Sequence, residues 1–346
     1  MSHQSSPILT IVMPVFNHPE LFSVMIDSII ANDFQEWELL AVDDGSEENA
    51  LQRLGQYESM DVRIRVIQRN EQPKGAQTCR NIGLREAKGE FIVFFDSDDY
   101  ITPVCLRNRV ERLRERPDLD FMVFPSGTYV DDIFLKVGRR DIYGYPLYHD
   151  DIKAFARRTL PFIVWNNIYR TSSLRKYDIV WDTRLKSLQD ADFNLQALLA
   201  GMKYEYVHCV PDYGYRISTT DSVSKKIVVE EHYRSHLYAL EKFYIEVQKR
   251  FGHRYDRALY QGVLFVYVMV FGEGVNITFA NKIVQLVNTH SKWYGMILGA
   301  QVKCSMLLGY FLPKKRARQI PVLLYLLRRS WREQRNKRVI AKLLFV

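Results

Sequence analysis

Two apolar, strand-like segments are each followed at once by acids, DDGS at residues 43–46 and DSDD at residues 96–99. Acids this close repel one another unless a cation or solvent relieves them. Asp96 and Asp98 would point to one side of an extended chain, so both could face one ligand. Hard oxygen ligands of this kind suit Mg²⁺ or Mn²⁺, which completes its shell with water and substrate phosphates. The alternative is an acidic turn in solvent that caps the next helix.

A third candidate carboxylate, Asp190, lies in the segment LQDADF at the start of a Leu- and Ala-rich stretch that predicts a helix over residues 189–200. A carboxylate projecting from the first turn of a helix into a cleft could act as a general base. The alternative is a first-turn acid that the helix dipole stabilises. Asp192 competes with Asp190 for the catalytic role.

The elements that must position these acids alternate between strand and helix in the first half of the chain. Apolar runs predict strands over residues 8–16, 37–42, 62–67, 90–95 and 121–124, and amphipathic spacing predicts helices over residues 18–31, 47–57, 76–87 and 104–116. Successive βα units of this kind form a doubly wound, mostly parallel sheet. Ligands of such sheets lie beyond the carboxyl ends of the strands, where both acidic motifs occur.

The remaining segments are less regular at first and then helical. Residues 126–161 predict loops that cover a cleft, and residues 203–208 predict a short strand. Beyond Lys225 nearly everything predicts helix, with breaks near Gly252, Gly274, Ser291 and Pro313. We therefore expect a catalytic domain over residues 1–224 and a helical basic region over residues 225–346.

No glycine-rich, phosphate-cradling loop follows the first predicted strand, because residues 14–18 read PVFNH. This argues against a nicotinamide dinucleotide fold and against a P-loop kinase. A bound nucleotide would instead be held through acids and a metal.

Four segments, taken in order, resemble glycosyltransferase family 2. They are MPVFN at residues 13–17, VDDGS at 42–46, CRNIGLREAKGEFIVFFDSDD at 79–99 and LQDADF at 188–193. The resemblance covers roughly residues 7–225. It implies a GT-A (Rossmann-like) fold, a mostly parallel sheet flanked by helices with a helical C-terminal extension, and an inverting enzyme of the bacterial surface-polysaccharide type.

The resemblance also implies roles for single residues on the donor side. Pro14 and Phe16 would line the pocket for the base and ribose, and Asp44 would accept a hydrogen bond from the base. Arg80 would lie near the nucleotide. The DxD motif would supply Asp96, for the ribose or the metal, and Asp98, as the main ligand of Mg²⁺ or Mn²⁺.

On the acceptor side the resemblance implies that Asp190 is the general base, with Phe193 as the family's trailing aromatic residue and Gln189 in place of its usual Glu. Trp165 and Asn166 resemble an acceptor-side segment, although Asn167 replaces the usual basic residue; a half-buried core Trp is the alternative. Arg216 and Lys225 could close over the diphosphate, or they could be ordinary surface charges.

Other polar clusters carry weaker signals. The pair Asp131-Asp132 and the run His149-Asp150-Asp151 lack a preceding apolar strand and are predicted to be solvated loop acids. The lone histidines His208 and His253 are predicted to be structural.

These residues predict transfer of a sugar from a nucleoside-diphosphate sugar, expected to be a UDP-sugar, to a hydroxyl of a cell-surface glycan or lipid-linked acceptor. The metal neutralises the leaving diphosphate and a carboxylate takes the hydroxyl proton. One alternative is a sugar nucleotidyltransferase, which predicts a basic, Gly-rich loop after the first strand that is missing here. Another is a non-catalytic GT-A scaffold protein at the membrane, against which the presence of Asp44, Asp98 and Asp190 argues.

Charge is distributed unevenly along the 346 residues. The chain has 48 Lys and Arg against 40 Asp and Glu, a formal net charge of +8. Residues 225–346 hold 22 basic and 7 acidic residues, so this part carries +15 and the remainder carries −7. An asymmetry of this size points to an anionic partner for the C-terminal region.

The C-terminal basic segment has the pattern of an interfacial helix. Residues 314–342 contain eleven basic residues and one acid, Glu333, while an apolar set recurs at helical spacing: Ile320, Leu323, Leu324, Leu327 and Trp331. Such a helix binds an anionic membrane surface, at roughly 1 kcal/mol per Lys or Arg near the surface. The alternatives are a helix packed on the catalytic domain with a solvated basic face, and an RNA-binding arm. Stacking aromatics are not interleaved with the charges, so no nucleic-acid partner is expected.

The expected location follows from what the sequence lacks. No segment has the about 18 uninterrupted apolar residues of a spanning helix, and the first residues, MSHQSSP, do not read as a signal peptide. Four scattered cysteines form no CxxC pair and are expected to be reduced thiols. We expect a cytoplasmic protein, peripheral on the inner face of the cell membrane.

Overall fold

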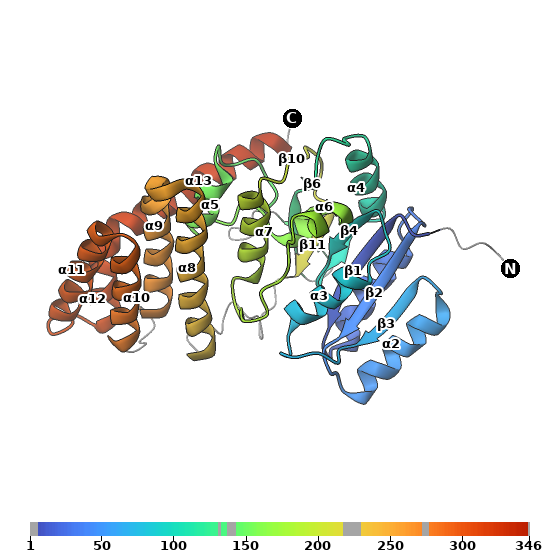
Figure 1. The fold of residues 1–346 in the computed structure, drawn as a ribbon, viewed down its shortest axis with the longest axis horizontal. Coiled ribbons are helices and arrows are strands. Elements are labelled where there is room, and N and C mark those ends of the chain that lie inside the picture. The colour runs from blue at the N-terminus through green and yellow to red at the C-terminus, as the bar shows by residue number, and fades with distance from the viewer. Residues whose placement is uncertain (1–5, 131–132, 137–142, 217–229, 272–276, 345–346) are drawn as a thin grey trace. The chain divides into compact units, whose positions relative to one another are not determined.

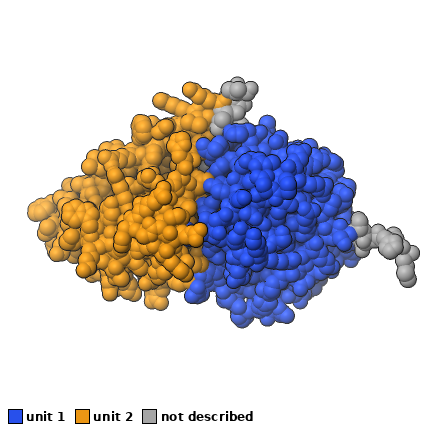
Figure 2. Space-filling view, turned by 45° about the horizontal axis from the view of Figure 1, so that its top comes forward, with its two compact units in different colours: residues 1–146, 161–184, 196–218 blue, residues 147–160, 185–195, 219–346 orange. Residues whose placement is uncertain are grey.

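The computed structural model describes residues 6–130, 133–136, 143–216, 230–271 and 277–344. The chain divides into two compact units, which Figure 2 shows in two colours. Unit 1 comprises Met1–Pro146, Pro161–Arg184 and Gln196–Ser218, and unit 2 comprises Leu147–Leu160, Leu185–Leu195 and Thr219–Val346. The expected boundary between residues 224 and 225 lies outside the described residues.

Unit 1 is built on a seven-stranded sheet with the order β10-β6-β9-β4-β1-β2-β3. Its strands are β1 Leu9–Val15, β2 Trp37–Asp43, β3 Ile64–Gln68, β4 Phe91–Phe94, β6 Phe121–Val123, β9 Asn167–Arg170 and β10 Tyr204–Tyr206. The pairings among β1 to β4 and between β6 and β10 are parallel, and β9 pairs antiparallel with both β4 and β6. The mostly parallel sheet that the sequence predicts is confirmed.

Helices on the faces of this sheet bury its central strands. The helices of unit 1 are α1 Pro19–Ile30, α2 Glu48–Met60, α3 Ala76–Glu86, α4 Cys105–Arg114, α6 Thr171–Lys176 and the 3₁₀ turn η1 Val164–Asn166 (Figure 1). Every residue of β1 is buried, as the nearly continuous apolar run of a central parallel strand predicts. Gly83 of α3 lets this helix approach β1, because a Cβ there would lie 2.3 Å from a methyl carbon of Val12.

A second sheet in unit 1 corrects the prediction of loops over residues 126–161. It has the order β5-β11-β7-β8, with β5 Tyr100–Ile101, β7 Ser126–Val130, β8 Ile133–Lys136 and β11 Tyr213–Arg216. The prediction was wrong because β7 pairs in parallel with β11, which lies about 85 residues further along the chain. A pairing between such distant segments leaves no periodic signal in a local window of sequence.

Unit 2 is helical, as the sequence predicts. Its elements are α5 Asp151–Ala156, the first seven residues of α7 Gln189–Ala200, α8 Glu230–Phe251, η3 Gly252–Tyr255, α9 Asp256–Val266, η4 Tyr267–Phe271, α10 Ile277–His290, α11 Lys292–Leu308, α12 Lys314–Gln319, η5 Ile320–Val322 and α13 Leu323–Leu344. The predicted breaks at Gly252, Ser291 and Pro313 are confirmed, and the one at Gly274 lies outside the described residues.

Within unit 2, α8 packs on α9 and α10, and α10 packs on α11 (Figure 1). The short helix α5, which also falls in the stretch predicted to be loop, packs on α9. None of the helices in the described ranges is long and apolar enough to cross a membrane.

Candidate functional site

The carboxyl ends of β1, β2 and β4 meet at one edge of the main sheet. The chain runs from β1 to β2 and β3 on one side and places β4 on the other side of β1, so the strand order reverses between β1 and β4. Asn17 ties the loops after β1 and β2 together, since its backbone N–H donates to Ser46 Oγ (2.8 Å) and its Oδ1 accepts from the Glu47 N–H (2.8 Å). Ligands of doubly wound sheets bind at this kind of reversal point.

Asp44, directly after β2, is held in place by groups that the sequence did not single out. Its Oδ1 accepts from Arg69 Nε at 2.5 Å and from the Gly75 N–H at 3.0 Å, and the Cys79 thiol lies 3.7 Å away. These contacts all go to Oδ1, and among the described residues none goes to Oδ2. One carboxylate oxygen is therefore fixed while the second can accept a hydrogen bond from a ligand.

The two residues expected to line a base pocket lie in different surroundings. Pro14 is buried within β1, whereas Phe16 is 46% exposed just beyond the strand. Lys74 Nζ lies 3.7 Å from the centroid of the Phe16 ring, a cation–π contact. Phe16 thus presents an open aromatic face next to a cation, which suits a flat base and its phosphates.

Arg80 of α3 neutralises Asp96. Arg80 Nη2 lies 2.5 Å from Asp96 Oδ1, and its guanidinium lies over the Trp181 ring at 4.4 Å. The Arg80 side chain is only 4% exposed, while that of Asp96 is 26% exposed. Arg80 therefore fixes a carboxylate that still reaches the surface.

Asp98 is a partly exposed acid at this edge whose negative charge is only partly compensated. Burial and the neighbouring Asp96 raise its pKa to about 6, against a smaller opposite effect of Arg216 and His18. Ser97 and Asp98 form a turn, so the expectation of an extended chain with both acids on one side is wrong. The turn nevertheless leaves the two carboxylates close enough to repel each other, which is the condition under which a bound cation stabilises both.

Asp99 is fully enclosed and tied to β11. It accepts hydrogen bonds from Tyr213 Oη at 2.6 Å and from the Arg216 backbone N–H at 2.8 Å. Burial and the charge of Asp98 hold its pKa well above the ordinary range. Arg216 Nε also donates to the Asp98 carbonyl oxygen at 2.9 Å, so this cation lies directly beside the acidic turn.

Trp165 and Asn166 lie inside unit 1, beneath β11. Trp165 is 7% exposed and stacks on both Tyr213 and Tyr215, with ring centroids 5.8 Å and 5.2 Å away. Asn166 has no exposed surface, and its side chain bonds the Phe124 carbonyl and the Ile163 N–H, each at 2.8 Å. Both residues thus support the backbone around the site.

A buried ion pair fixes the start of β11. Arg109 of α4 and Asp212 form two hydrogen bonds, of 2.8 Å and 2.6 Å, and Arg109 Nη1 also donates to the Trp165 carbonyl at 2.7 Å. Arg109 is fully buried. This complete pairing anchors the strand that carries Tyr213 and Arg216.

A divalent cation fits the DSDD turn as a partly built site. In the described parts of the chain no three His, Cys, Asp or Glu side chains are grouped so that they could hold a metal. Asp96 and Asp98 offer two carboxylates, one of them with an uncompensated charge. Mg²⁺ and Mn²⁺ are commonly bound by one or two carboxylates together with water and nucleotide phosphates, so this donor set fits them.

Asp190 and Asp192 both lie in the first turn of α7, in unit 2, and differ in their surroundings. Asp192 is 2% exposed and pairs with Lys242 of α8 at 2.8 Å. Asp190 is partly exposed. Leu188, just before the helix, has a φ of 71°, a left-handed conformation that is unusual for leucine.

The weaker candidates from the sequence have structural roles. The prediction of solvated acids is wrong for Asp150, which caps α5 through the Lys153 N–H (2.9 Å) and accepts from Tyr255 Oη (3.0 Å), and for Asp151, which is buried. The acids lacked a strand signal because they cap a helix instead. His253 pairs with Asp256 at 3.0 Å. His208 is exposed, and Asp131, Asp132 and Lys225 lie outside the described residues.

Sequence reasoning missed several residues at the sheet edge. Arg69 follows the last residue of β3, so the rule about carboxyl ends of strands could have found it. Lys74 and Gly75 lie in the loop from β3 to α3 at the same edge. Tyr213 gave no signal, because its importance comes from the second sheet. The four cysteines, as expected, form no disulfide.

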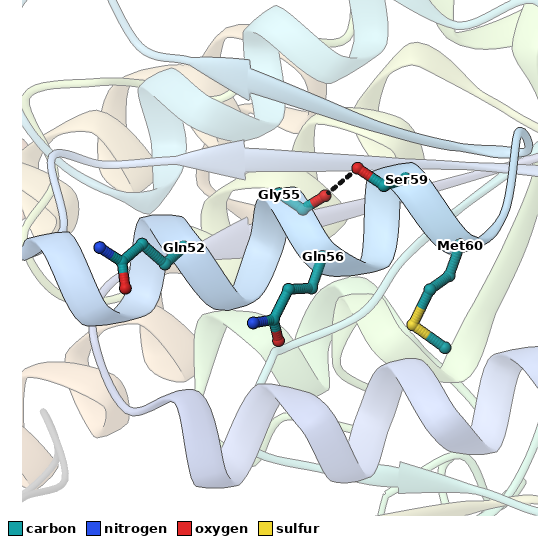
Figure 3. Close-up of a pocket in the computed structure, with 5 residues that line it drawn as sticks. All are labelled: Gln52, Gly55, Gln56, Ser59 and Met60. Carbon is teal, nitrogen blue, oxygen red and sulfur yellow. Dashed lines mark hydrogen bonds between the residues drawn. The ribbon is translucent and has the colours of Figure 1, made fainter.

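A surface hollow on α2 is lined by residues without a titratable side chain: Gln52, Gly55, Gln56, Ser59 and Met60 (Figure 3). The hydrogen bond drawn there, from Ser59 Oγ to the Gly55 carbonyl at 2.8 Å, is internal to the helix. All five residues come from one helix, so the hollow has the character of a shallow surface feature without groups for catalysis.

Comparison with known proteins agrees with this geometry. The sequence model of the family described as glycosyl transferase family 2 matches residues 10–178. The uncharacterized glycosyltransferase EpsJ of Bacillus subtilis is 25% identical over 55% of this chain and 56% of its own length. The Escherichia coli UDP-Glc:alpha-D-GlcNAc-diphosphoundecaprenol beta-1,3-glucosyltransferase WfgD is 38% identical over 30% of this chain and 38% of its own. The chain thus spans about half or less of these relatives.

A solved structure resembles almost the whole chain. The crystal structure of S. aureus TarS 1-349 in complex with UDP-GlcNAc superposes with a TM-score of 0.67, covering 92% of this chain and 91% of that one, at 19% identity. The chain thus shares the GT-A fold of TarS, a mostly parallel sheet flanked by helices with a helical C-terminal region. Residues 10–178 belong to glycosyltransferase family 2, the family that the sequence motifs indicated.

Proposed function

We propose that this protein is an inverting glycosyltransferase that moves a sugar from a nucleoside-diphosphate sugar to a hydroxyl group. The observation that carries the proposal is the edge of the main sheet, where Asp44 and Asp96 are each held by an arginine while Asp98 keeps an uncompensated charge. Two fixed acids and one that needs a cation match the requirements of a metal-bridged nucleotide diphosphate.

The donor would bind with its base between Phe16 and Asp44. Phe16 offers an exposed ring, and Asp44 Oδ2 would accept from a base N–H, as the uracil ring provides. Pro14 and Arg80 would act indirectly. Pro14 would shape the end of β1, and Arg80 would hold Asp96 in position. A UDP-sugar is supported by the names of two similar proteins, one solved with UDP-GlcNAc and one described as using UDP-Glc.

Asp98, with Asp96, would hold Mg²⁺ or Mn²⁺. When bound, the cation would neutralise charge on the leaving diphosphate. The residues of this chain would do the rest: Arg216, beside the Asp98 carbonyl, would lie near the phosphates, and Tyr213 would keep Asp99 in place beneath the turn.

Asp190 would be the general base that takes the proton of the acceptor hydroxyl. The partial exposure of Asp190 and the pairing of Asp192 with Lys242 support this choice between the two acids. A one-step displacement of this kind inverts the anomeric configuration. A cell-surface glycan or a lipid-linked acceptor is supported by the name of WfgD, and the acceptor-side roles of Trp165 and Asn166 stay predictions.

The C-terminal helix α13 would hold the protein on the inner face of the cell membrane, with residues 1–224 as the catalytic domain and residues 225–346 as the membrane-associated region. Tyr325 and Ile340 on α13 are buried. The apolar set instead faces outward, with the following exposures: Ile320 44%, Leu323 50%, Leu324 74%, Leu327 58% and Trp331 63%. An outward apolar stripe beside arginines is the pattern of an interfacial helix.

A donor panel tests the enzymatic proposal. Purified protein with Mn²⁺ should transfer from, or slowly hydrolyse, one of a set of UDP-, GDP- and dTDP-sugars. Asp190→Asn should keep donor affinity and lose about 10²- to 10⁴-fold in turnover, the usual size of general-base catalysis. Asp192→Asn is the matched control and should unfold more easily yet turn over normally. Full activity of Asp190→Asn would reject the base, and inertness toward every donor would favour a scaffold.

Vesicle flotation tests the membrane proposal. The triple variant Leu324→Ser, Leu327→Ser, Trp331→Ser should lose binding to vesicles that contain anionic lipid. The control removes three equally exposed apolar side chains from unit 1: Met60→Ser, Val62→Ser and Val210→Ser, which are 75%, 80% and 69% exposed. Equal flotation of both variants would reject the role of α13.

A further inference from the structure

Five arginines gather within unit 2, and none of them is a residue proposed to bind the donor. Arg157 and Arg158 follow α5, Arg257 lies in the first turn of α9, and Arg329 and Arg332 lie on α13. Arg157 interacts with Arg257 and Arg332, and Arg158 interacts with Arg329. Like charges from three helices are thus brought into one cluster, which we call the arginine cluster.

Arg158 is the most enclosed member of the arginine cluster. It is 7% exposed, and its Nε and Nη1 atoms are buried without a hydrogen-bond partner in the described chain. Its backbone has a φ of 62°, in the left-handed region. Gly262 of α9 makes room for it, because a Cβ there would lie 2.3 Å from the Ala156 carbonyl oxygen and 3.1 Å from Arg158 Cγ. The local backbone and a glycine thus accommodate an unpaired cation.

Too few acids face the arginine cluster to neutralise it. Two carboxylates of the described residues interact with it: Asp150, which already bonds Lys153 and Tyr255, and Glu333, which is 57% exposed and lies 3.3 Å from Arg329. Burial, then the charge of Arg329, lowers the pKa of Arg158 to about 9. The pKa of Arg157 is lowered by burial, then by Arg332 and Arg257.

Aromatic and polar groups complete the surroundings of these cations. The Phe265 ring has the Arg329 guanidinium at 4.1 Å and that of Arg158 at 5.7 Å from its centroid. The Tyr148 hydroxyl accepts a hydrogen bond from Asn336 Nδ2 at 3.0 Å and interacts electrostatically with Arg332 and Arg329. The rings orient the guanidinium planes, and the hydroxyl and amide add neutral hydrogen-bonding groups.

We propose that the arginine cluster is a binding site for a phosphoryl group, independent of the donor site. A guanidinium presents a planar fork of N–H donors that matches the oxygens of a phosphate. Five cations against two acids require a ligand with more than one negative charge, which a phosphate ester or diphosphate carries and a single carboxylate does not. The phosphoryl group comes from a lipid head group or from a free phosphate ester, two sources that an experiment separates.

Thermal unfolding with phosphate probes tests this site. Inorganic phosphate and glycerol 1-phosphate, compared with chloride at equal ionic strength, should raise the Tm of the wild type and of Arg328→Gln, an exposed arginine of α13 outside the cluster. Arg158→Met should abolish this rise in Tm. Arg257→Gln should at least halve it, and because Arg257 is exposed, its replacement should not disturb the fold. Without phosphate, Arg158→Met should be at least as stable as the wild type, because the substitution removes a buried charge that has no partner. If Arg158 had only a structural role, its replacement would lower the Tm.

The source of the phosphoryl group is resolved by a second arm. Vesicles of phosphatidylglycerol are compared with vesicles of phosphatidylcholine, and flotation is measured for wild type, Arg158→Met and Arg234→Gln, a control at an exposed arginine of α8. Loss of phosphatidylglycerol binding in Arg158→Met alone assigns a lipid head group, while a Tm shift by free phosphate with unchanged flotation assigns a free ester. Equal phosphate shifts in wild type, Arg158→Met and Arg257→Gln, or no response to any phosphate source, would overturn the proposal.

Discussion

The acidic turn of unit 1 brings negative charges together, and the arginine cluster of unit 2 brings positive charges together. In the acidic turn, Asp96 is paired with Arg80 and Asp99 accepts a hydrogen bond from Tyr213, yet the pKa values of both Asp98 and Asp99 are raised by burial and by the neighbouring acids. In the arginine cluster, Arg158 has neither an acid nor an acceptor in the described chain. Each of the two proposed ligands, a divalent cation and a phosphoryl group, would carry the charge opposite to that of its region.

A third buried charge supplies the reference for both. Arg109 and Asp212 are as deeply buried as Arg158, yet they satisfy each other through two hydrogen bonds. The fold can therefore neutralise a buried arginine where neutrality is needed. The unpaired Arg158 and the raised pKa of Asp98 therefore support the two proposed binding sites.

The largest expected effect comes from Asp98→Asn. Turnover should fall about 10²- to 10³-fold, because a group that stabilises charge in the transition state is lost. The free energy of unfolding of the variant at neutral pH should instead rise. The native pKa of Asp98 is raised to about 6, so the native state binds more protons than the unfolded chain between the ordinary carboxyl pKa and about 6, and the wild type loses stability as the pH rises through this range. An asparagine does not titrate and avoids this loss.

Initial rates and urea unfolding at pH 7 and pH 5 measure both effects. Asp98→Asn should be more stable than wild type at pH 7, and this advantage should shrink at pH 5, where native Asp98 is protonated. The exposed Glu115→Gln is the control, with unchanged rate and stability. An Asp98→Asn enzyme that is less stable at pH 7 would contradict the idea of an uncompensated acid.

The second prediction sets a satisfied cation against an unsatisfied one. Asp212→Asn leaves Arg109 buried with its charge unpaired and should lower the free energy of unfolding by about 3–5 kcal/mol. Asp118→Asn, which breaks the exposed pair with Arg116, should have a far smaller effect, because water and salt screen that pair. Urea denaturation of these variants beside Arg158→Met gives the comparison, and a loss of similar size in Arg158→Met would erase the distinction between the two arginines.

How far the sequence could predict these regions depends on how local the signals are. The acids at residues 44, 96 and 98 follow apolar strands directly, so both the strands and the sheet edge could be predicted from them. Their partners Arg69 and Tyr213 lie on other elements, and the second sheet forms between segments far apart in the chain.

The arginine cluster shows the same limit more strongly. Arg157 and Arg158 are about 170 residues from Arg329 and Arg332, and in the sequence the latter two are part of a basic run. That run predicts an amphipathic helix, but no local pattern indicates that two of its arginines turn inward toward α5 and α9. The composition could predict the excess of positive charge in this region. Only the packing of the three helices shows which arginines lie close together.

The third prediction concerns pH, with a sign opposite to that of Asp98. His236 of α8 is 4% exposed, and burial, Arg158 and His232 lower its pKa to about 3. The unfolded chain protonates this histidine below about 6.5 and the native state does not, so the free energy of unfolding should fall as the pH drops below that value. The contribution between pH 7 and pH 5 is about 2 kcal/mol.

Urea unfolding as a function of pH measures this contribution. His236→Gln should flatten the decline between pH 6.5 and pH 5, whereas His208→Gln, at an exposed position, should leave it unchanged. Phosphate bound at the arginine cluster should also reduce the decline, because a bound anion lessens the effect of Arg158 on His236. Equal slopes of wild type and His236→Gln over this range would contradict the enclosure of His236 beside Arg158.

The smallest effect separates burial from charge as the cause of the contrast. Arg234 pairs with Glu230 one turn away on α8, and both side chains are well exposed, at 68% and 59%. Arg234→Gln should change the free energy of unfolding by less than about 0.5 kcal/mol, because water and salt screen the pair. It should also leave the phosphate-induced Tm shift intact. A larger loss, or a weaker phosphate response, would mean that cations anywhere on unit 2 act alike, and the enclosure of Arg158 would no longer explain its preference for a phosphoryl group.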